Sequence, residues 1–160
     1  MKSRHSERAK RSKNLYRDAS AKKPQHDRGL YRILDANFNR AKEGLRVCED
    51  ICRYAWDNKP LTKSYKDVRH GLTQVGALLS FDKALAARDI AADVGTLTTA
   101  SERKRKDLGA VFGANSQRVK ESLRVVEEVA KLLDKKAAQN AKSLRYKVYE
   151  LEQKAFRSFP

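Results

Sequence analysis

The sequence predicts an all-α protein, a helical bundle of two similar helix-pair repeats at about residues 29–80 and 106–157. Apolar residues recur at spacings of three and four along most of the chain, as on one face of an α-helix, and no alternating strand pattern of any length is present. The stretch from Asp35 to Ile51 is also repeated, in the same frame, from Gly113 to Val129. We therefore expect two antiparallel helix pairs related by a pseudo-twofold axis.

Most of the residues that the two copies share are polar. Shared apolar residues would require only a common core, whereas shared amide, guanidinium and carboxylate groups suggest that two helices present the same chemistry. The first copy contributes Asn37, Arg40, Lys42, Glu43, Leu45, Arg46, Val47 and Glu49, and the second contributes Asn115, Arg118, Lys120, Glu121, Leu123, Arg124, Val125 and Glu127.

The first repeat opens with a long helix, from about Gly29 to Tyr54. The segment Trp56–Pro60 ends it, because proline disfavours a helical residue before it and cannot continue the hydrogen-bond ladder. Thr62 is the expected N-cap of the second helix. Both helices have one apolar face. These faces comprise Leu34, Phe38, Ala41, Leu45, Cys48, Cys52 and Ala55 in the first helix, and Tyr65, Val68, Leu72, Val75 and Leu79 in the second.

Asp82 is the expected cap of a short helical segment, Lys83–Arg88. An irregular stretch follows as far as residue 107, and loops of this length in compact domains are usually functional or mobile. The second repeat then predicts a long helix and a last helix at about Gln139–Phe156. The apolar face of this long helix is Phe112, Val119, Leu123, Val126, Ala130 and Leu133, with Ser116 in one polar position. In the last helix Arg145-Tyr146 echoes Arg69-His70 of the first repeat.

The 160 residues suffice for one domain, at residues 28–160, preceded by a basic tail at residues 1–27. The tail lacks apolar periodicity and cannot bury enough surface to offset chain entropy, so we expect it to be disordered. The net charge of the whole chain is +16. Such a charge attracts phosphate in any form, whether in nucleotides, phosphorylated metabolites or nucleic acid.

No apolar run approaches the length of a membrane span, and the N-terminus has no apolar segment of a secretory signal peptide. The two cysteines, Cys48 and Cys52, lie four apart on an apolar helical face, where a disulfide would need distorted geometry. They therefore indicate core positions in a reducing compartment. We expect a soluble cytoplasmic protein.

Two groups of residues are candidates for chemistry. Asn37 and Arg40, with their copies Asn115 and Arg118, fall at the rim of the apolar face, where a neighbouring helix can complete a pocket. Rim placement equally suits salt bridges between helices, and for Glu43 and Arg46 ordinary pairing along one helix is the simpler account. The second group is the segment Arg88–Thr96, which offers a guanidinium, the carboxylates of Asp89 and Asp93, and the turn Gly95-Thr96. The plainer alternative for this segment is a capped helix end and a solvated loop.

Several stretches together resemble one known family: Leu30–Asp50, Leu61–Leu72, Ala87–Thr96 and Asn115–Lys131. It is the all-helical domain often fused ahead of thiamine-phosphate synthase in bacteria, and it is regarded as a hydroxymethylpyrimidine phosphate kinase. The resemblance covers roughly residues 29 to 157. It implies ATP-dependent phosphorylation of 4-amino-5-hydroxymethyl-2-methylpyrimidine phosphate to the diphosphate, with ATP and Mg²⁺ as cofactors.

In that reaction the acceptor is already an ionised phosphate, so catalysis needs positioning and charge neutralisation more than a strong base. The cations expected to serve it are Arg40, Arg46, Arg88, Arg118 and Arg124. Asp89 and Asp93 are the expected magnesium ligands. The expected substrate contacts are Asn37, Asn115, Glu43, His70, Gly95 and Thr96, with Asn37 or Asn115 on the aminopyrimidine edge.

Two other functions remain open at this level. A non-catalytic helical module could bind a phosphorylated thiamine intermediate or a partner enzyme. A nucleic-acid-binding protein would act through the basic tail, although aromatic residues are not interleaved with the basic ones as on a base-stacking surface. As partners we expect a separate thiamine-phosphate synthase, because the synthase barrel is absent from this chain, and a homodimer, because the bundle has two similar faces.

Overall fold

The computed structural model describes residues 23–91 and 105–158 of the chain. Within these residues the protein is all-α, with five α-helices, one π-helical turn and no strand, which confirms the predicted fold class. The elements are α2 (Lys23–Asp50), η1 (Ile51–Ala55), α3 (Lys59–Leu78), α4 (Phe81–Ala86), α5 (Leu108–Ala130) and α6 (Lys135–Arg157). None of these helices combines the length and apolar character that crossing a membrane requires.

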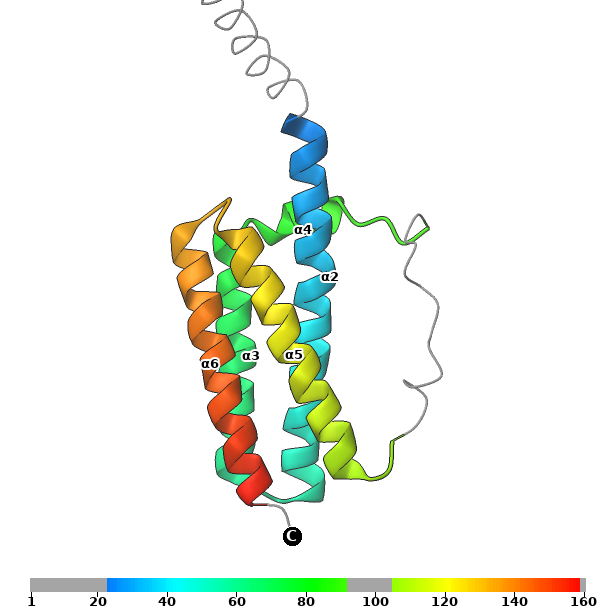
Figure 1. Ribbon diagram of the computed structural model, residues 1–160, viewed down its shortest axis with the longest axis vertical. Coiled ribbons are helices and arrows are strands. Elements are labelled where there is room, and N and C mark those ends of the chain that lie inside the picture. Colours follow the sequence, from blue (N-terminus) through cyan, green and yellow to red (C-terminus); the bar gives the residue numbers. More distant parts are fainter. Residues whose placement is uncertain (1–22, 92–104, 159–160) are drawn as a thin grey trace, which may run out of the picture.

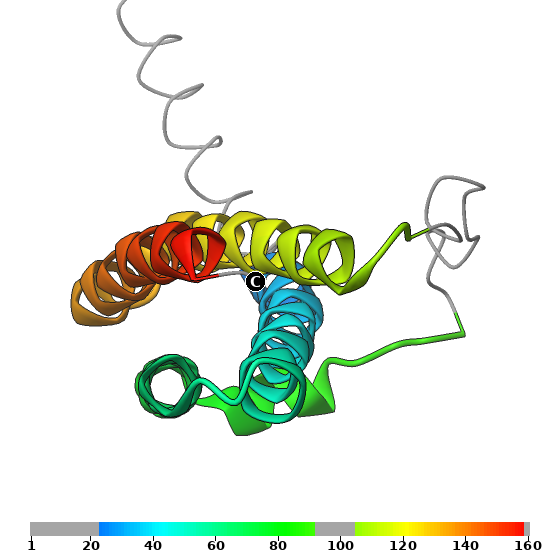
Figure 2. The same ribbon diagram turned by 90° about the horizontal axis from the view of Figure 1, so that it is seen from below.

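The four long helices form an antiparallel bundle (Figures 1 and 2). α2 packs against α3 and α5, and α6 packs against α5 and α3, so each long helix has two long neighbours. The short α4 lies against α2 at the end of the bundle where α3 ends, whereas α5 begins at the opposite end (Figure 1). The predicted helix pairs are therefore present, and the pseudo-twofold relation between them stays a prediction.

The predicted apolar faces form the core. Leu34, Phe38, Leu45 and their neighbours on the first face are at most 1% exposed as far as Cys52. Two predicted positions lie outside the core because each follows the end of its α-helix: Ala55 is exposed, and Leu133 is 37% exposed. Cys48 and Cys52 are buried free thiols, as predicted. Burial raises the pKa of Cys52 to about 11, so its thiol stays protonated at neutral pH.

Four predicted helix starts are corrected. α2 begins at Lys23 and not at about Gly29, so it includes residues of the predicted tail. Asn58, and not Thr62, caps α3, because its side chain accepts a hydrogen bond from the backbone N–H of Leu61 at 3.0 Å. Pro60 lies in the first turn of α3, where proline is tolerated because its missing N–H would have no intrahelical partner anyway. α4 begins at Phe81, one residue before its predicted cap Asp82. α6 begins four residues earlier than predicted, at Lys135, because Asp134 caps it by accepting from the N–H of Ala137 at 2.7 Å.

The backbones of α2 and α5 approach closely at Gly44. A Cβ atom on Gly44 would lie 2.7 Å from Cγ2 of Val119 and 3.0 Å from the backbone oxygen of Asn115. Real Cβ atoms do not come this close to their neighbours, so any side chain here would push the two helices apart. The absence of a side chain at Gly44 therefore sets the spacing of the central helix pair.

This close approach predicts opposite effects for two glycines of the same helix. Gly44→Ala gains helix propensity, about 1 kcal/mol, but overpacks the α2–α5 contact, which typically costs about 1–3 kcal/mol. Gly29→Ala gains the same propensity without the clash, since no neighbouring atom lies within 4 Å of the position that its Cβ would take. We expect the free energy of unfolding to fall in Gly44→Ala and to rise or stay level in Gly29→Ala, measured by urea denaturation. Equal stabilisation by both substitutions would contradict the close packing.

Candidate functional site

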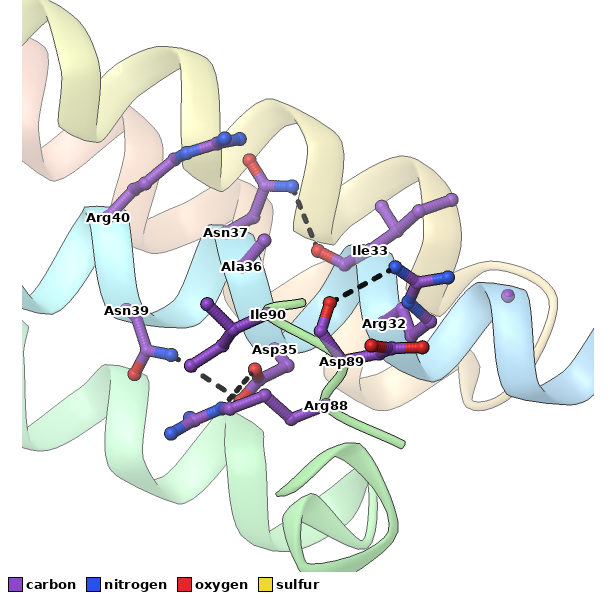
Figure 3. Close-up of a pocket in the computed structure, with 11 residues that line it drawn as sticks. Arg32, Ile33, Asp35, Ala36, Asn37, Asn39, Arg40, Arg88, Asp89 and Ile90 are labelled. Atoms are coloured by element: carbon purple, nitrogen blue, oxygen red, sulfur yellow. Dashed lines mark hydrogen bonds and ion pairs between the residues drawn. The ribbon is translucent and has the colours of Figure 1, made fainter. Parts of the chain in front are cut away.

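A pocket of about 620 Å³ lies on α2 beside the segment that follows α4 (Figure 3). This volume is within the range of small-molecule sites. Its wall combines guanidinium, carboxylate, amide and aliphatic groups from two parts of the chain. The lining residues are Gly29, Arg32, Ile33, Asp35, Ala36, Asn37, Asn39, Arg40, Arg88, Asp89 and Ile90.

Aromatic packing places α4 next to this face of α2. The ring of Phe81, at the start of α4, lies edge-on to Phe38 of α2, with ring centroids 5.0 Å apart. Gly76 of α3 makes room for Phe38, whose Cε1 would be 3.3 Å from a Cβ at that position. α4 is only six residues long. The contact of Phe81 with α2 therefore also keeps the residues that follow α4 close to α2.

Asp35 and Arg88 lock that segment onto α2 by a bidentate ion pair. The guanidinium donates from Nε to Oδ2 at 2.7 Å and from Nη2 to Oδ1 at 2.6 Å, and Asp35 is only 5% exposed. Such forked pairs are among the strong hydrogen bonds of proteins because they fix direction as well as distance. The hydrogen bonds to Asp35 raise the pKa of Arg88, so this guanidinium stays charged at any physiological pH.

Two further arginines hold Asp89. Nη2 of Arg32 donates to the backbone oxygen of Asp89 at 3.4 Å, and Nη2 of Arg28 lies 3.6 Å from its carboxylate. Across the described part of the chain, no group of three or more His, Cys, Asp or Glu side chains is placed to hold a metal ion. Asp93, the second expected magnesium ligand, lies outside the described residues, as do Gly95 and Thr96. The predicted pairing of Asp89 with Asp93 therefore stays a prediction.

Arg40 is the cation of the pocket that makes no ion pair or hydrogen bond with any described residue. Its side chain is exposed and extends past Asn37 on the side of the pocket nearer α5 (Figure 3). The three arginines of the lining outnumber its two carboxylates. An unpaired guanidinium in a wall with excess positive charge is suited to an anionic ligand, and to phosphate in particular.

Aliphatic groups occupy the middle of the same wall. Ile33 and Ile90 are 42% and 72% exposed, which is unusual for isoleucine, and the small side chain of Ala36 lies between the two polar sides of the pocket (Figure 3). A flat apolar surface flanked by cations and amides suits a planar ring that carries a phosphate group.

At the matching place in the second copy of the repeat, the described residues form a different surface. The residue that corresponds to Asp35 is Gly113, and Cζ of Phe156 lies 3.5 Å from where a Cβ of Gly113 would be. Phe156 also packs on Phe112, with ring centroids 6.2 Å apart. An aromatic side chain thus covers the position that a carboxylate occupies in the first copy. Asn115 and Arg118 line neither this pocket nor the smaller one between α5 and α6.

Several other predicted site residues join helices to one another. Glu49 accepts hydrogen bonds from Arg69 at 3.0 Å and from Arg46 at 3.4 Å, which ties α2 to α3. The second copy repeats this arrangement between α5 and α6: Glu127 accepts from Arg145 at 2.9 Å and from Arg124 at 3.1 Å. Of the two predicted explanations for the repeated polar residues, salt bridges between helices therefore account for this part.

Arg124 also lines a second, smaller pocket of about 430 Å³ between α5 and α6. The cations of this pocket are already neutralised within the protein. Lys120 donates to Glu152 at 2.6 Å and its ammonium group lies 5.2 Å from the ring centroid of Tyr149, while Arg145 and Arg124 bind Glu127. Glu43 and His70 are exposed and line neither pocket. The first pocket is therefore the better candidate for ligand binding.

The structure thus brings together four predicted residues, Asn37, Arg40, Arg88 and Asp89, from stretches that are some fifty positions apart. Sequence reasoning did not single out Asp35, Arg32 or Asn39. Asp35 opens the repeated stretch but has no polar counterpart in the second copy, so a search for shared polar residues discards it. The signal that could have found it is this difference between the copies.

Comparison with known proteins gives one family and several relatives. The model of the ThiD2 family matches residues 32–154. The chain is 49% identical over 124 residues to a thiamine-phosphate synthase of Synechocystis sp., a match that covers 77% of the chain and 35% of that protein. A thiamine-phosphate synthase of Thermosynechococcus vestitus is 46% identical over 125 residues (78% and 34%), and one of Rhodopirellula baltica is 40% identical over 123 residues (76% and 33%).

The chain spans about a third of the length of these relatives, and the matching part is their N-terminal region. No solved structure gives a significant match to the chain.

The ion pair at Asp35 predicts a local effect of its removal. In Asp35→Asn the amide cannot accept two charged hydrogen bonds, so the segment after α4 should open more often while the bundle persists. We expect backbone amides 87–91 to exchange hydrogen faster, with exchange in α5 and α6 unchanged, measured by mass spectrometry. Asp82→Asn, at an exposed position of α4, is the matched control and should change neither. Unaltered exchange at 87–91 in Asp35→Asn would show that the pair does not hold the segment.

Proposed function

The chain belongs to the ThiD2 family, and on that premise we propose that it phosphorylates 4-amino-5-hydroxymethyl-2-methylpyrimidine phosphate with ATP. The product would be the corresponding diphosphate, a precursor in thiamine biosynthesis. The names of the relatives, thiamine-phosphate synthases, support the pathway. The observation that carries the proposal is the pocket on α2, in which an unpaired arginine and a locked arginine flank an aliphatic surface.

The substrate fits this wall by chemistry. Its pyrimidine ring is planar and would lie over Ala36 between Ile33 and Ile90. Its phosphate would lie towards Arg40, whose guanidinium has no other anion to bind among the described residues. Arg88 adds a second positive charge at a fixed position because Asp35 holds it.

The transfer itself requires little from a base. An oxygen of the substrate phosphate attacks the γ-phosphorus of ATP, the bond from that phosphorus to the bridging oxygen breaks, and ADP leaves with the electron pair. The attacking oxygen is already ionised at neutral pH, so no proton has to be removed. The arginines lower the repulsion between the two anionic reactants and stabilise the charge of the transferring group.

Magnesium would normally accompany ATP and would be held through phosphate oxygens and one or two carboxylates. In the described wall Asp35 is committed to Arg88, and Asp89 is the other carboxylate of the lining. Asp89 is therefore the described carboxylate that fits a magnesium ion best. When bound, the ion would neutralise charge on the nucleotide phosphates.

A matched pair of arginine variants tests the proposal. Arg40 and Arg118 hold the same place in the two copies, both are exposed, and neither has a partner among the described residues, but only Arg40 lines the pocket. Arg40→Ala should lower kcat/KM for the pyrimidine phosphate by about 100-fold or more, the typical loss when one charge-stabilising donor is removed. Arg118→Ala should stay within a few-fold of the unmodified protein. The measurement is ATP-dependent diphosphate formation by purified protein, and equal losses in both variants would disprove the assignment of the site.

The two alternative functions, a non-catalytic binding module and a nucleic-acid-binding protein, predict different experimental results. A non-catalytic module would bind the pyrimidine phosphate in the same pocket but release no ADP, which calorimetry and a coupled ADP assay separate. Binding of nucleic acid rests on the tail, and its residues 1–22 lie outside the described structure, so that function stays a prediction. A thiamine-phosphate synthase is the partner that we propose, because the relatives that carry the matching region are named thiamine-phosphate synthases.

A further inference from the structure

The amide of Asn37 is fixed in one orientation at the edge of the pocket. Its Nδ2 donates to the backbone oxygen of Ile33, one turn earlier in α2, at 2.9 Å. Only the NH₂ end of an amide can donate to a carbonyl, so a flipped side chain would bring two acceptors together. Asn37 is 8% exposed, and this burial further limits its rotation.

This bond leaves Oδ1 of Asn37 as a hydrogen-bond acceptor. Among the described residues no group donates to it, and in Figure 3 it points away from Ile33, towards the side of the pocket where Arg40 lies. Of the two N–H groups of Nδ2, one is thus committed to Ile33, and Oδ1 is the fixed acceptor that Asn37 offers to a ligand's N–H or O–H.

We infer that Asn37 is a specificity-determining residue that selects a pyrimidine with an exocyclic amino group over one with an oxo group at the same position. This inference rests on the proposed function and deepens it. An amino group would donate to Oδ1. An oxo group would place its lone pairs against those of Oδ1, with no donor between them, and a site built around a hydrogen bond rejects analogues that cannot make it.

The other amide of the wall is a weaker candidate. Nδ2 of Asn39 reaches Oδ1 of Asp35 at 3.4 Å, a longer contact, and Asn39 is less buried than Asn37. Its amide is thus held less firmly, and a rotating amide offers either end to a ligand. An amide can discriminate amino from oxo groups only when its orientation is fixed, and the orientation of Asn37 is fixed by its bond to Ile33.

The second copy of the repeat supplies a control for the structural part of this role. Asn115 donates to the backbone oxygen of Val111 at 2.8 Å, the same bond in the same register, but lies outside the pocket. Replacing Asn115 therefore removes an equivalent helix bond without touching the proposed ligand contact.

The test compares two substrates, the 4-amino pyrimidine phosphate and its 4-oxo analogue, in each variant with ATP. We expect the unmodified protein to prefer the amino compound by at least about 100-fold in kcat/KM. Asn37→Ala and the similarly sized Asn37→Leu should reduce this ratio to less than about tenfold, while Asn115→Ala keeps it. The ratio does not depend on the fraction of folded protein, because loss of folded protein lowers both rates equally.

Each outcome decides one of the two claims. A preference below tenfold in the unmodified protein, or an unchanged ratio in both Asn37 variants, overturns the role of Asn37 and leaves the proposed kinase function standing. No ADP formation with either pyrimidine overturns the proposed function and the inference with it.

Discussion

The ion pair between Asp35 and Arg88 is the interaction on which the pocket depends. It joins the long helix α2 to a segment that follows a helix of six residues, too short to fix its own direction. Without the pair, the segment would be held to α2 by fewer contacts, among them those of Arg32 and Arg28 to Asp89, and this side of the wall would be less firmly placed. The pair also engages one carboxylate and one guanidinium of the wall, whereas Arg40 has no hydrogen-bond or ion-pair partner among the described residues. A rigid scaffold that carries binding groups on a connecting segment is a common way to build a site.

The repeated polar residues have two different explanations. Asn37 and Asn115 make the same bond to a backbone oxygen, and Glu49 and Glu127 join the two helices of each pair through arginines. These contacts stabilise helices and need no ligand. The pocket occurs where the copies differ, at Asp35. The difference between the repeats at Asp35 therefore locates the candidate site, and its wall also includes the shared residues Asn37 and Arg40.

The fold was predictable because apolar residues spaced three and four apart lie on one face of a helix, and that face packs into the core. Leu34, Phe38 and Leu45 are all buried as expected. Helix starts were harder to predict from the sequence. Asn58 and Thr62 are both chemically suitable caps for α3, as Asp82 is for α4, and only the course of the backbone decides where each helix begins. Asn37 and Arg40 could be placed at a rim from helical geometry alone. Asp35 could not, because its meaning comes from Arg88, 53 positions later, and no local pattern connects the two.

The packing of Phe156 over Gly113 has a consequence for stoichiometry. A protein with two similar halves invites the expectation of two equivalent binding sites and of cooperativity between them. Because an aromatic ring covers the second location in the described structure, the candidate pocket on α2 has no equivalent at the matching place of the second half. If the pocket on α2 is the ligand site, one equivalent of ligand would saturate the chain along a simple hyperbola, although the sequence contains a repeat.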